Sequence, residues 1–108
     1  MNLRLVQFNL GAGTRDTAQA IADRVVPLIR AQPGCNRCEF FGDAQSGDHG
    51  IVVLWASKQD ADAAAGVVSP VLTPLLRDAG ATGESRRLFE VLEPRTERIS
   101  PGYPLASS

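Results

Sequence analysis

The stretch LRLVQFNL (residues 3–10) decides the fold. Side chains of an extended chain alternate in direction, so every second residue shares a face. One face carries Arg4, Val6, Phe8 and Leu10, and the other carries Leu3, Leu5, Gln7 and Asn9. Both faces hold apolar groups, which indicates a strand covered on both sides.

Outward from this strand, helical and extended patterns alternate. A helical pattern covers residues 14–32 and a second one covers 57–79, while extended runs cover 35–41, 51–55 and 87–92. With the first strand, the order is βαββαβ, the ferredoxin-like arrangement. The sequence therefore predicts an α+β fold, with a four-stranded antiparallel sheet that has its helices on one face.

Prolines mark interruptions in both helical stretches. Pro27 lies within the first and is expected to bend it, because proline lacks an N–H. Ser69-Pro70 is typical of a fresh helix start, with serine as N-cap and proline at the first helical position. The second stretch is therefore predicted to form two helices, at residues 58–67 and 70–79.

Composition limits the class of protein. The chain has 108 residues, 44% of them hydrophobic, and a net charge of −1. We predict one domain at residues 1–94 and a C-terminal tail at 95–108, rich in proline and glycine. A net charge near zero provides no positive electrostatic field to attract the phosphates of a nucleic acid. The absence of a long apolar run and of a signal-peptide pattern leads us to expect a cytoplasmic protein without membrane contact.

The sheet face that the helices leave bare predicts self-association. The alternation places either Val52 and Leu54 or Ile51 and Val53 on that face. A large apolar patch is not tolerated on a soluble monomer. We therefore expect a two-fold homodimer, sheet against sheet.

Three short motifs resemble a known family. They are Gln32-Pro33-Gly34-Cys35 followed by Glu39-Phe40, then Leu54-Trp55-Ala56-Ser57-Lys58-Gln59, then Ser69-Pro70. In order and spacing, they resemble the domains of the antibiotic biosynthesis monooxygenase (ABM) type in the dimeric α/β-barrel superfamily. The resemblance covers about residues 3–93.

The resemblance implies a homodimer with a pocket between each sheet and its own helices. Relatives of this type include cofactor-free oxygenases acting on polycyclic phenols, quinol oxygenases and haem-degrading enzymes. The family often carries a histidine on the helix after the tryptophan, where this chain has Ala64 and Ala65. The only histidine, His49, is predicted to lie exposed in a hairpin loop. A haem-binding protein of this type would therefore lack the histidine that serves as axial ligand to the iron.

Four residues are candidate site residues. Trp55 and Asn9 are the catalytic candidates, since an indole stacks on aromatic rings and some relatives hold oxygen or substrate with a strand-one asparagine. Gln7 and Arg37 are candidates for the substrate pocket. Plainer roles stay open for each: core packing for Trp55, a bond to a neighbouring loop for Asn9 and Gln7, and solvent exposure for Arg37.

The Cys35-x-x-Cys38 pair suggests redox or metal chemistry, but its position argues against both. Residues i and i+3 of a strand point to opposite faces. A thioredoxin-type thiolate needs a helix N-terminus, whereas this pair follows a helix end. We predict that both cysteines are structural.

The sequence contains no nucleophile–base pair, no carboxylate pair and no phosphate-binding loop. Any chemistry must then be done largely by the substrate, as in a cofactor-free oxygenase whose phenolate substrate reacts with dioxygen directly. The leading hypothesis is a small homodimeric, cofactor-independent monooxygenase acting on an aromatic or quinol-type molecule. The alternatives are a non-catalytic ligand-binding or accessory dimer and, third, a haem-binding or haem-degrading protein.

Overall fold

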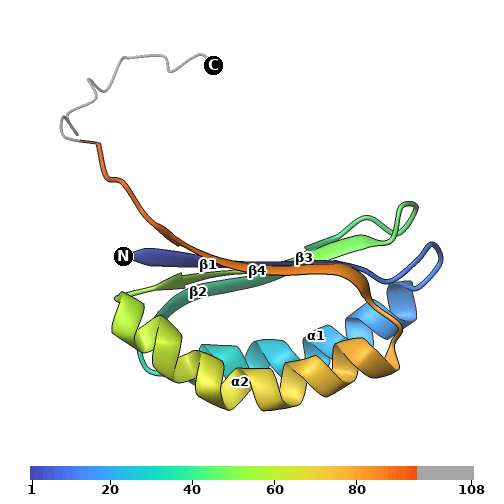
Figure 1. Cartoon of the computed structure of the whole chain (residues 1–108), viewed down its shortest axis with the longest axis horizontal. Helices are drawn as coiled ribbons and strands as arrows, with labels where there is room; N and C mark the ends of the chain where they lie inside the picture. Colours follow the sequence, from blue (N-terminus) through green and yellow to red (C-terminus); the bar gives the residue numbers. More distant parts are fainter. Residues whose placement is uncertain (95–108) are drawn as a thin grey trace.

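The computed structural model describes residues 1–94 and confirms the predicted order of elements (Figure 1). The elements are β1 (Asn2–Asn9), α1 (Arg15–Arg30), β2 (Cys35–Gly42), β3 (Asp48–Trp55), α2 (Lys58–Asp78) and β4 (Thr82–Glu90). The strands form one antiparallel sheet in the order β2-β3-β1-β4, and both helices cover the same face of it. The tail predicted at residues 95–108 lies outside the described residues.

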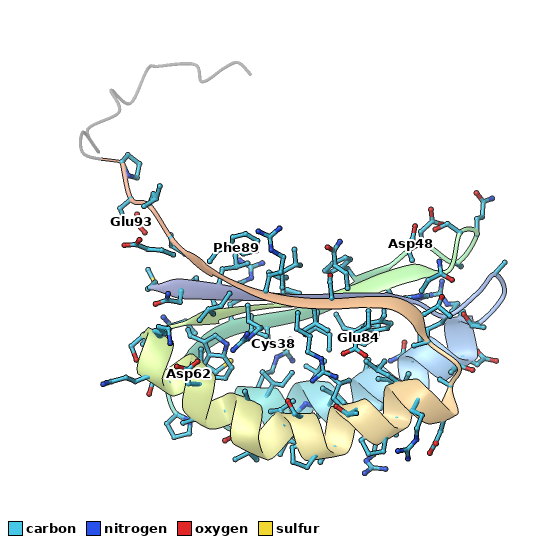
Figure 2. The ribbon with its side chains drawn as sticks, in the orientation of Figure 1. Cys38, Asp48, Asp62, Glu84, Phe89 and Glu93 are labelled. Carbon is cyan, nitrogen blue, oxygen red and sulfur yellow. The ribbon has the colours of Figure 1, made fainter. Side chains whose placement is uncertain are left out.

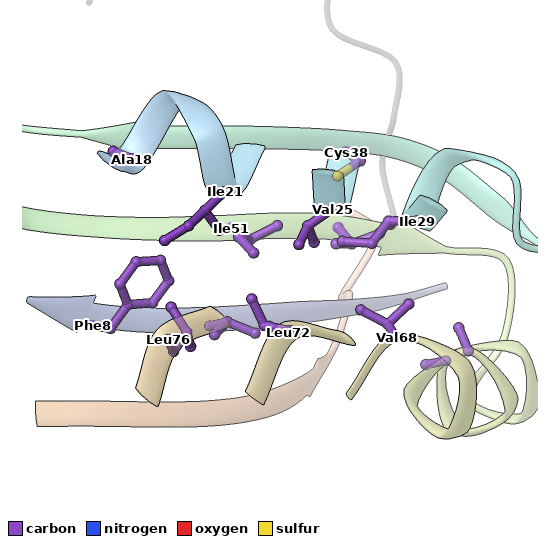
Figure 3. Packing of buried hydrophobic residues seen from close by; sticks show 14 of the residues in the cluster. Phe8, Ala18, Ile21, Val25, Ile29, Cys38, Ile51, Val68, Leu72 and Leu76 are labelled. Atoms are coloured by element: carbon purple, nitrogen blue, oxygen red, sulfur yellow. The ribbon is translucent and has the colours of Figure 1, made fainter. Parts of the chain in front are cut away.

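The helix-covered face of the sheet holds the core. Val6, Phe8 and Leu10 are buried there, as the alternation along the first strand predicts. From α1, a stripe at steps of three and four packs onto them (Figure 3). That stripe consists of Ala18, Ile21, Val25 and Ile29. Thus β1, between β3 and β4, forms the floor of the core.

The opposite face of the sheet carries no helix. At its centre, Leu3 lies across from Leu54 on one neighbouring strand and from Phe89 on the other. Leu5 and Val52 form the next pair, and all five side chains are only partly buried. Figure 2 shows Phe89 on this outer side, away from the helices. The apolar pair on this face is therefore Val52 and Leu54, the first of the two predicted alternatives.

The prediction of two separate helices at residues 58–67 and 70–79 is wrong, because α2 runs unbroken from Lys58 to Asp78. Ser57 caps it, with its Oγ accepting from the Asp60 N–H at 3.1 Å. Pro70 removes the main-chain bond to the carbonyl of Gly66, an exposed position where water can replace it. The buried stripe of Val68 and Leu72 continues through the proline and holds the helix on the core.

Two strands begin earlier than predicted. β3 starts at Asp48 instead of residue 51, and β4 starts at Thr82 instead of residue 87. The added part of β4 is polar, so it carries no apolar alternation that would indicate a strand. Pairing with the full length of β1 holds it in place.

Candidate active site: an apolar cavity beneath the sheet

A cavity of about 260 Å³ lies between the sheet and the helices. Its floor comes from β1 and β3, its main wall from α2, and one side from β4 and α1. The lining residues are Arg4, Val6, Ile29, Ile51, Val53, Trp55, Ala61, Ala64, Ala65, Val68, Ser69, Leu72 and Arg86. The cavity is thus mostly apolar with a few polar groups, the usual character of a small-molecule site.

Small residues in the first half of α2 line the cavity. Ala61, Ala64 and Ala65 face it where a larger side chain would fill the space above Val53. The second half of the helix is different, since Leu72 and Leu76 are buried there and close the core. Alanine favours helix strongly, so this segment keeps its structure while leaving the volume open.

Trp55 ends β3 and lines the cavity, as the sequence hypothesis of a pocket tryptophan requires. Its side chain is 3% exposed, and its indole Nε1 is buried without a hydrogen-bond partner in the described residues. A buried donor without a partner costs about 1–3 kcal/mol. The catalytic role of Trp55 stays a prediction.

Two arginines that were not predicted as site residues also line the cavity. Arg4 projects from β1, and its Nη2 lies 4.0 Å from Oδ1 of Asp62. The signal was present, since an arginine alternates with Val6 and Phe8 on the inward face.

Arg86 reaches across from β4 to α2. Its Nη1 donates to Ser69 Oγ at 3.1 Å and its Nη2 donates to Thr73 Oγ1 at 3.0 Å. Its Nε donates to Glu84, which Figure 2 shows between the sheet and the helices. The sequence pattern missed Arg86 because the last strand was predicted to begin one residue after it.

The structure does not bring Asn9 to Trp55. The Asn9 side chain donates to Ser46 O at 3.0 Å and to Asp48 Oδ1 at 2.9 Å, and accepts from Gly11 N at 2.8 Å. It thereby ties the β2–β3 loop to the end of β1. These contacts agree with the plainer role left open for Asn9, a bond to a neighbouring loop.

Gln7 and Arg37 also lie away from the cavity. Gln7 is exposed and borders a separate hollow that it shares with Asn9. Arg37 is exposed opposite Leu54, with its Nε 3.3 Å from Oε2 of Glu39. Of the four predicted site residues, only Trp55 lines the cavity.

His49 was expected to be exposed in a loop, and this prediction is wrong. It lies in β3, is 7% exposed and packs against both Phe8 and Phe40. Its Nδ1 lies 2.8 Å from the carbonyl oxygen of Gly47, so Nδ1 carries the proton. On the neighbouring strand, a Cβ at Gly42 would lie 2.0 Å from the His49 ring. The glycine therefore makes room for the histidine.

The two cysteines lie on the same side of the sheet, contrary to the prediction of opposite faces. β2 has a bulge between Cys35 and Arg37, and the extra residue reverses the alternation. Burial raises the pKa of Cys38 to about 11, and the nearby Cys35 thiol acts in the same direction. Burial also raises the pKa of Cys35. Both thiols are thus protonated at neutral pH, unlike reactive cysteines.

By sequence, the chain matches no protein-family model and no curated protein. By structure, it is similar to SnoaB, a cofactor-independent oxygenase from Streptomyces nogalater, with a TM-score of 0.65 and 16% identity over 89% of this chain and 97% of the other. A protein described as an antibiotic biosynthesis monooxygenase gives a TM-score of 0.67 and 15% identity over 86% of this chain and all of the other.

The chain has the ABM fold. This confirms the fold that the sequence motifs suggested. Another protein of similar structure is a variant of MhuD with two manganese protoporphyrin IX molecules bound per active site, with a TM-score of 0.64 and 18% identity over 87% of this chain and 97% of the other. In that MhuD variant, a protein of similar structure holds a porphyrin.

Within residues 1–94, no three side chains of the His, Cys, Asp and Glu types gather as metal ligands would. Neither helix of this part of the chain has the length and apolarity to cross a membrane.

Proposed function

We propose that the chain is a cofactor-independent monooxygenase that oxidises an aromatic or quinol-type small molecule in the cavity beneath the sheet. The observation that carries this proposal is the apolar cavity itself, with Trp55 in its wall. An indole face offers a stacking surface for an aromatic ring. The ABM fold shared with a cofactor-independent oxygenase supports the same assignment.

The reaction needs little from the protein beyond position and a dry environment. An ionised phenol gives one electron to dioxygen, and the resulting radical and superoxide combine at a ring carbon that bears hydrogen. The peroxide anion formed there takes up a proton equivalent to the one that the phenol lost on ionisation. Loss of water from the peroxide leaves a quinone carbonyl, so one oxygen atom enters the product and the other leaves as water. The apolar lining excludes solvent from these steps and orients the ring.

Cavity residues support this assignment by what they lack. Among the lining residues described, none is a histidine, cysteine, aspartate or glutamate. General acid–base catalysis by a side chain of these types is therefore not built into the cavity. Trp55 is assigned to the wall against which the ring stacks, while the described contacts of Asn9 give it a role in holding the loop.

Residues in the cavity do not fit haem. A haem iron is held by an axial side chain such as histidine or a cysteine thiolate. His49 and both cysteines lie outside the lining of the cavity. We therefore do not propose haem binding or haem degradation for this chain, although the family it resembles includes haem-degrading enzymes.

A ligand-binding dimer without catalysis is the second candidate. It needs only the apolar cavity to hold a small molecule. Oxygen uptake decides between the two. Purified protein with a dihydroxynaphthalene should consume oxygen faster than heat-denatured protein does, and mass spectrometry under ¹⁸O₂ should find one labelled oxygen in the product. Binding without uptake would leave the ligand-binding candidate in place.

The proposal includes a homodimer formed through the bare sheet face. Leu3 lies at the centre of its apolar patch, so Leu3→Glu should place a charge in the interface and give a monomer in analytical ultracentrifugation. Val67→Glu is the matched control, because Val67 is an exposed apolar residue on α2, away from that face. A wild-type monomer at micromolar concentration would contradict the dimer.

A further inference from the structure

Two arginines share the inward face of neighbouring strands. In the β1–β4 pairing, Arg4 lies opposite Leu88 and Val6 lies opposite Arg86, so the two arginines are diagonal neighbours. Such neighbours are about 7–8 Å apart. Their side chains are 22% and 26% exposed, so water screens the repulsion between them only in part. This arrangement costs stability unless a negative charge lies nearby.

Protein carboxylates supply only part of that negative charge. Glu84 pairs with Arg86. Asp62 lies 4.0 Å from Arg4 but 2.7 Å from Lys58 Nζ, so its charge is shared with the closer lysine. With Glu84 assigned to Arg86 and Asp62 to Lys58, Arg4 is left over. Glu90 is the other diagonal neighbour of Arg4 on this face, but it is exposed and forms no ion pair with Arg4 among those described. Arg4 therefore has no carboxylate closer than 4.0 Å among its described ion pairs.

Polar groups around the cavity are mostly donors. Arginine and tryptophan side chains only donate, and a serine hydroxyl does both. The indole Nε1 of Trp55 also lacks a partner among the described residues, but this atom is fully buried and does not face the cavity. Arg86 donates to the neutral hydroxyls of Ser69 and Thr73. A ligand that complements this lining must bring hydrogen-bond acceptors.

From this we infer that the cavity selects an aromatic anion, a flat ring system with a single ionised oxygen that lies against Arg4 and Arg86. The inference rests on the proposed function, since it names the class of molecule that the same cavity holds. A cavity of ~150 Å³ accommodates one benzene ring. A cavity of about 260 Å³ therefore suits a ligand of roughly two rings.

The ionised oxygen has two chemical sources, a carboxylate or a phenolate. Both accept charge-assisted hydrogen bonds from guanidinium groups. A phenolate bound in this way is also the form that reacts with dioxygen. A carboxylate leaves the ring to be oxidised elsewhere, and then the arginines determine its orientation.

A competing explanation gives Arg86 a purely structural role, in which its side chain only joins β4 to α2. That explanation accounts for the bonds to Ser69 and Thr73. It does not account for Arg4, which reaches no partner closer than 4.0 Å among its described ion pairs. The two explanations differ in what they predict for charged and neutral ligands of one shape.

The test is calorimetric titration of the intact protein with 1-naphthoate and with the neutral 1-naphthamide. Naphthoate should bind roughly tenfold more tightly, since a hydrogen bond to a charged group exceeds a neutral one by about that factor. Arg86→Gln and Arg4→Gln should each remove most of the preference. Arg86→Lys should retain part of it. Arg77→Gln, at an exposed position on α2, is the matched control.

A third titration with 1-naphthol at rising pH separates the two sources of the anion. Affinity that increases as the hydroxyl ionises supports the phenolate, and a preference confined to naphthoate supports the carboxylate. Equal binding of naphthoate and naphthamide by the wild-type protein would overturn the inference, and so would a preference that survives both glutamine variants. These outcomes do not depend on oxygen uptake, so the inference can fail while the proposed oxidation stands, and the reverse also holds.

Discussion

The two ends of strand β1 both carry polar side chains, and they differ in how completely those side chains are bonded. At the loop end, the Asn9 amide takes part in three hydrogen bonds and His49 packs against two phenylalanines. At the cavity end, among the described residues, Arg4 has a carboxylate only at 4.0 Å and Trp55 has a buried N–H without a partner. Polar groups that satisfy one another hold a fold together, whereas incompletely bonded ones indicate where a ligand binds.

The largest effect is expected at the closely packed loop end. Gly42→Ala places a methyl group 2.0 Å from the buried His49 ring, so the free energy of unfolding should fall by about 3 kcal/mol. Gly66→Ala is the control, since nothing lies within 4 Å of its new Cβ and alanine stabilises a helix interior by about 1 kcal/mol. Urea unfolding measures both. A mild effect of Gly42→Ala would show that the loop end has room to adjust.

The next largest effect tests Asn9 as a structural group. Asn9→Ala removes three hydrogen bonds and should lower the free energy of unfolding by about 2 kcal/mol. Gln7→Ala, at an exposed position on the same strand, should change it by less than about 0.5 kcal/mol. Ligand affinity should stay unchanged in both variants. Loss of oxygen uptake in an Asn9→Ala protein of normal stability would restore the catalytic hypothesis.

A smaller stability effect is expected at the cavity end. Trp55→Phe removes volume but also removes a buried donor without a partner, so the free energy of unfolding should change by less than about 1.5 kcal/mol. The binding of 1-naphthoate should weaken, because stacking area is lost. Calorimetry is the suitable measurement, since Trp55 is the sole tryptophan. Strong destabilisation with unchanged affinity would make Trp55 a core residue only.

The smallest effect at neutral pH concerns the buried thiol of Cys38. Its pKa rises from 9.0 to about 11 in the folded protein, so the folded state holds its proton more tightly than the unfolded state. Its contribution to stability is complete below pH 9 and is lost as the pH rises through about 11. Cys38→Ala should flatten the decline of stability with pH in that range. An unchanged decline in the variant would assign it to other groups.

The sequence predicted the fold well because the spacing of apolar residues along a strand or helix indicates which side chains are buried. The alternation in residues 3–10 and the stripe from Ala18 to Ile29 both appear as predicted. Proline was the misleading signal in α2, because the propensity of Pro70 to begin a helix was weaker than the packing of Val68 and Leu72 on the core.

The site was predicted less well because it depends on which residues meet across the sheet. Trp55 was found because its indole can stack on aromatic rings and because it stands in a motif that resembles the ABM type. Arg86 was not, because a polar edge strand has no pattern that marks its inward face. Residue type suggested Asn9 and Arg37, but only the pairing of strands shows that one is bonded to a loop and the other is exposed.

Two prolines remove two main-chain hydrogen bonds from the part of α2 beside the cavity. Pro70 and Pro74 leave the carbonyls of Gly66 and Pro70 without their usual partners, so two successive turns resist bending less than the rest of the helix. Arg86 bonds to Ser69 and Thr73 within this same segment. The helix that walls the cavity therefore lacks two main-chain hydrogen bonds in the segment that Arg86 ties to the neighbouring strand. A molecule that draws Arg86 away from those hydroxyls would gain an ion pair with Arg86. It would also remove the two side-chain hydrogen bonds that join this segment of α2 to β4.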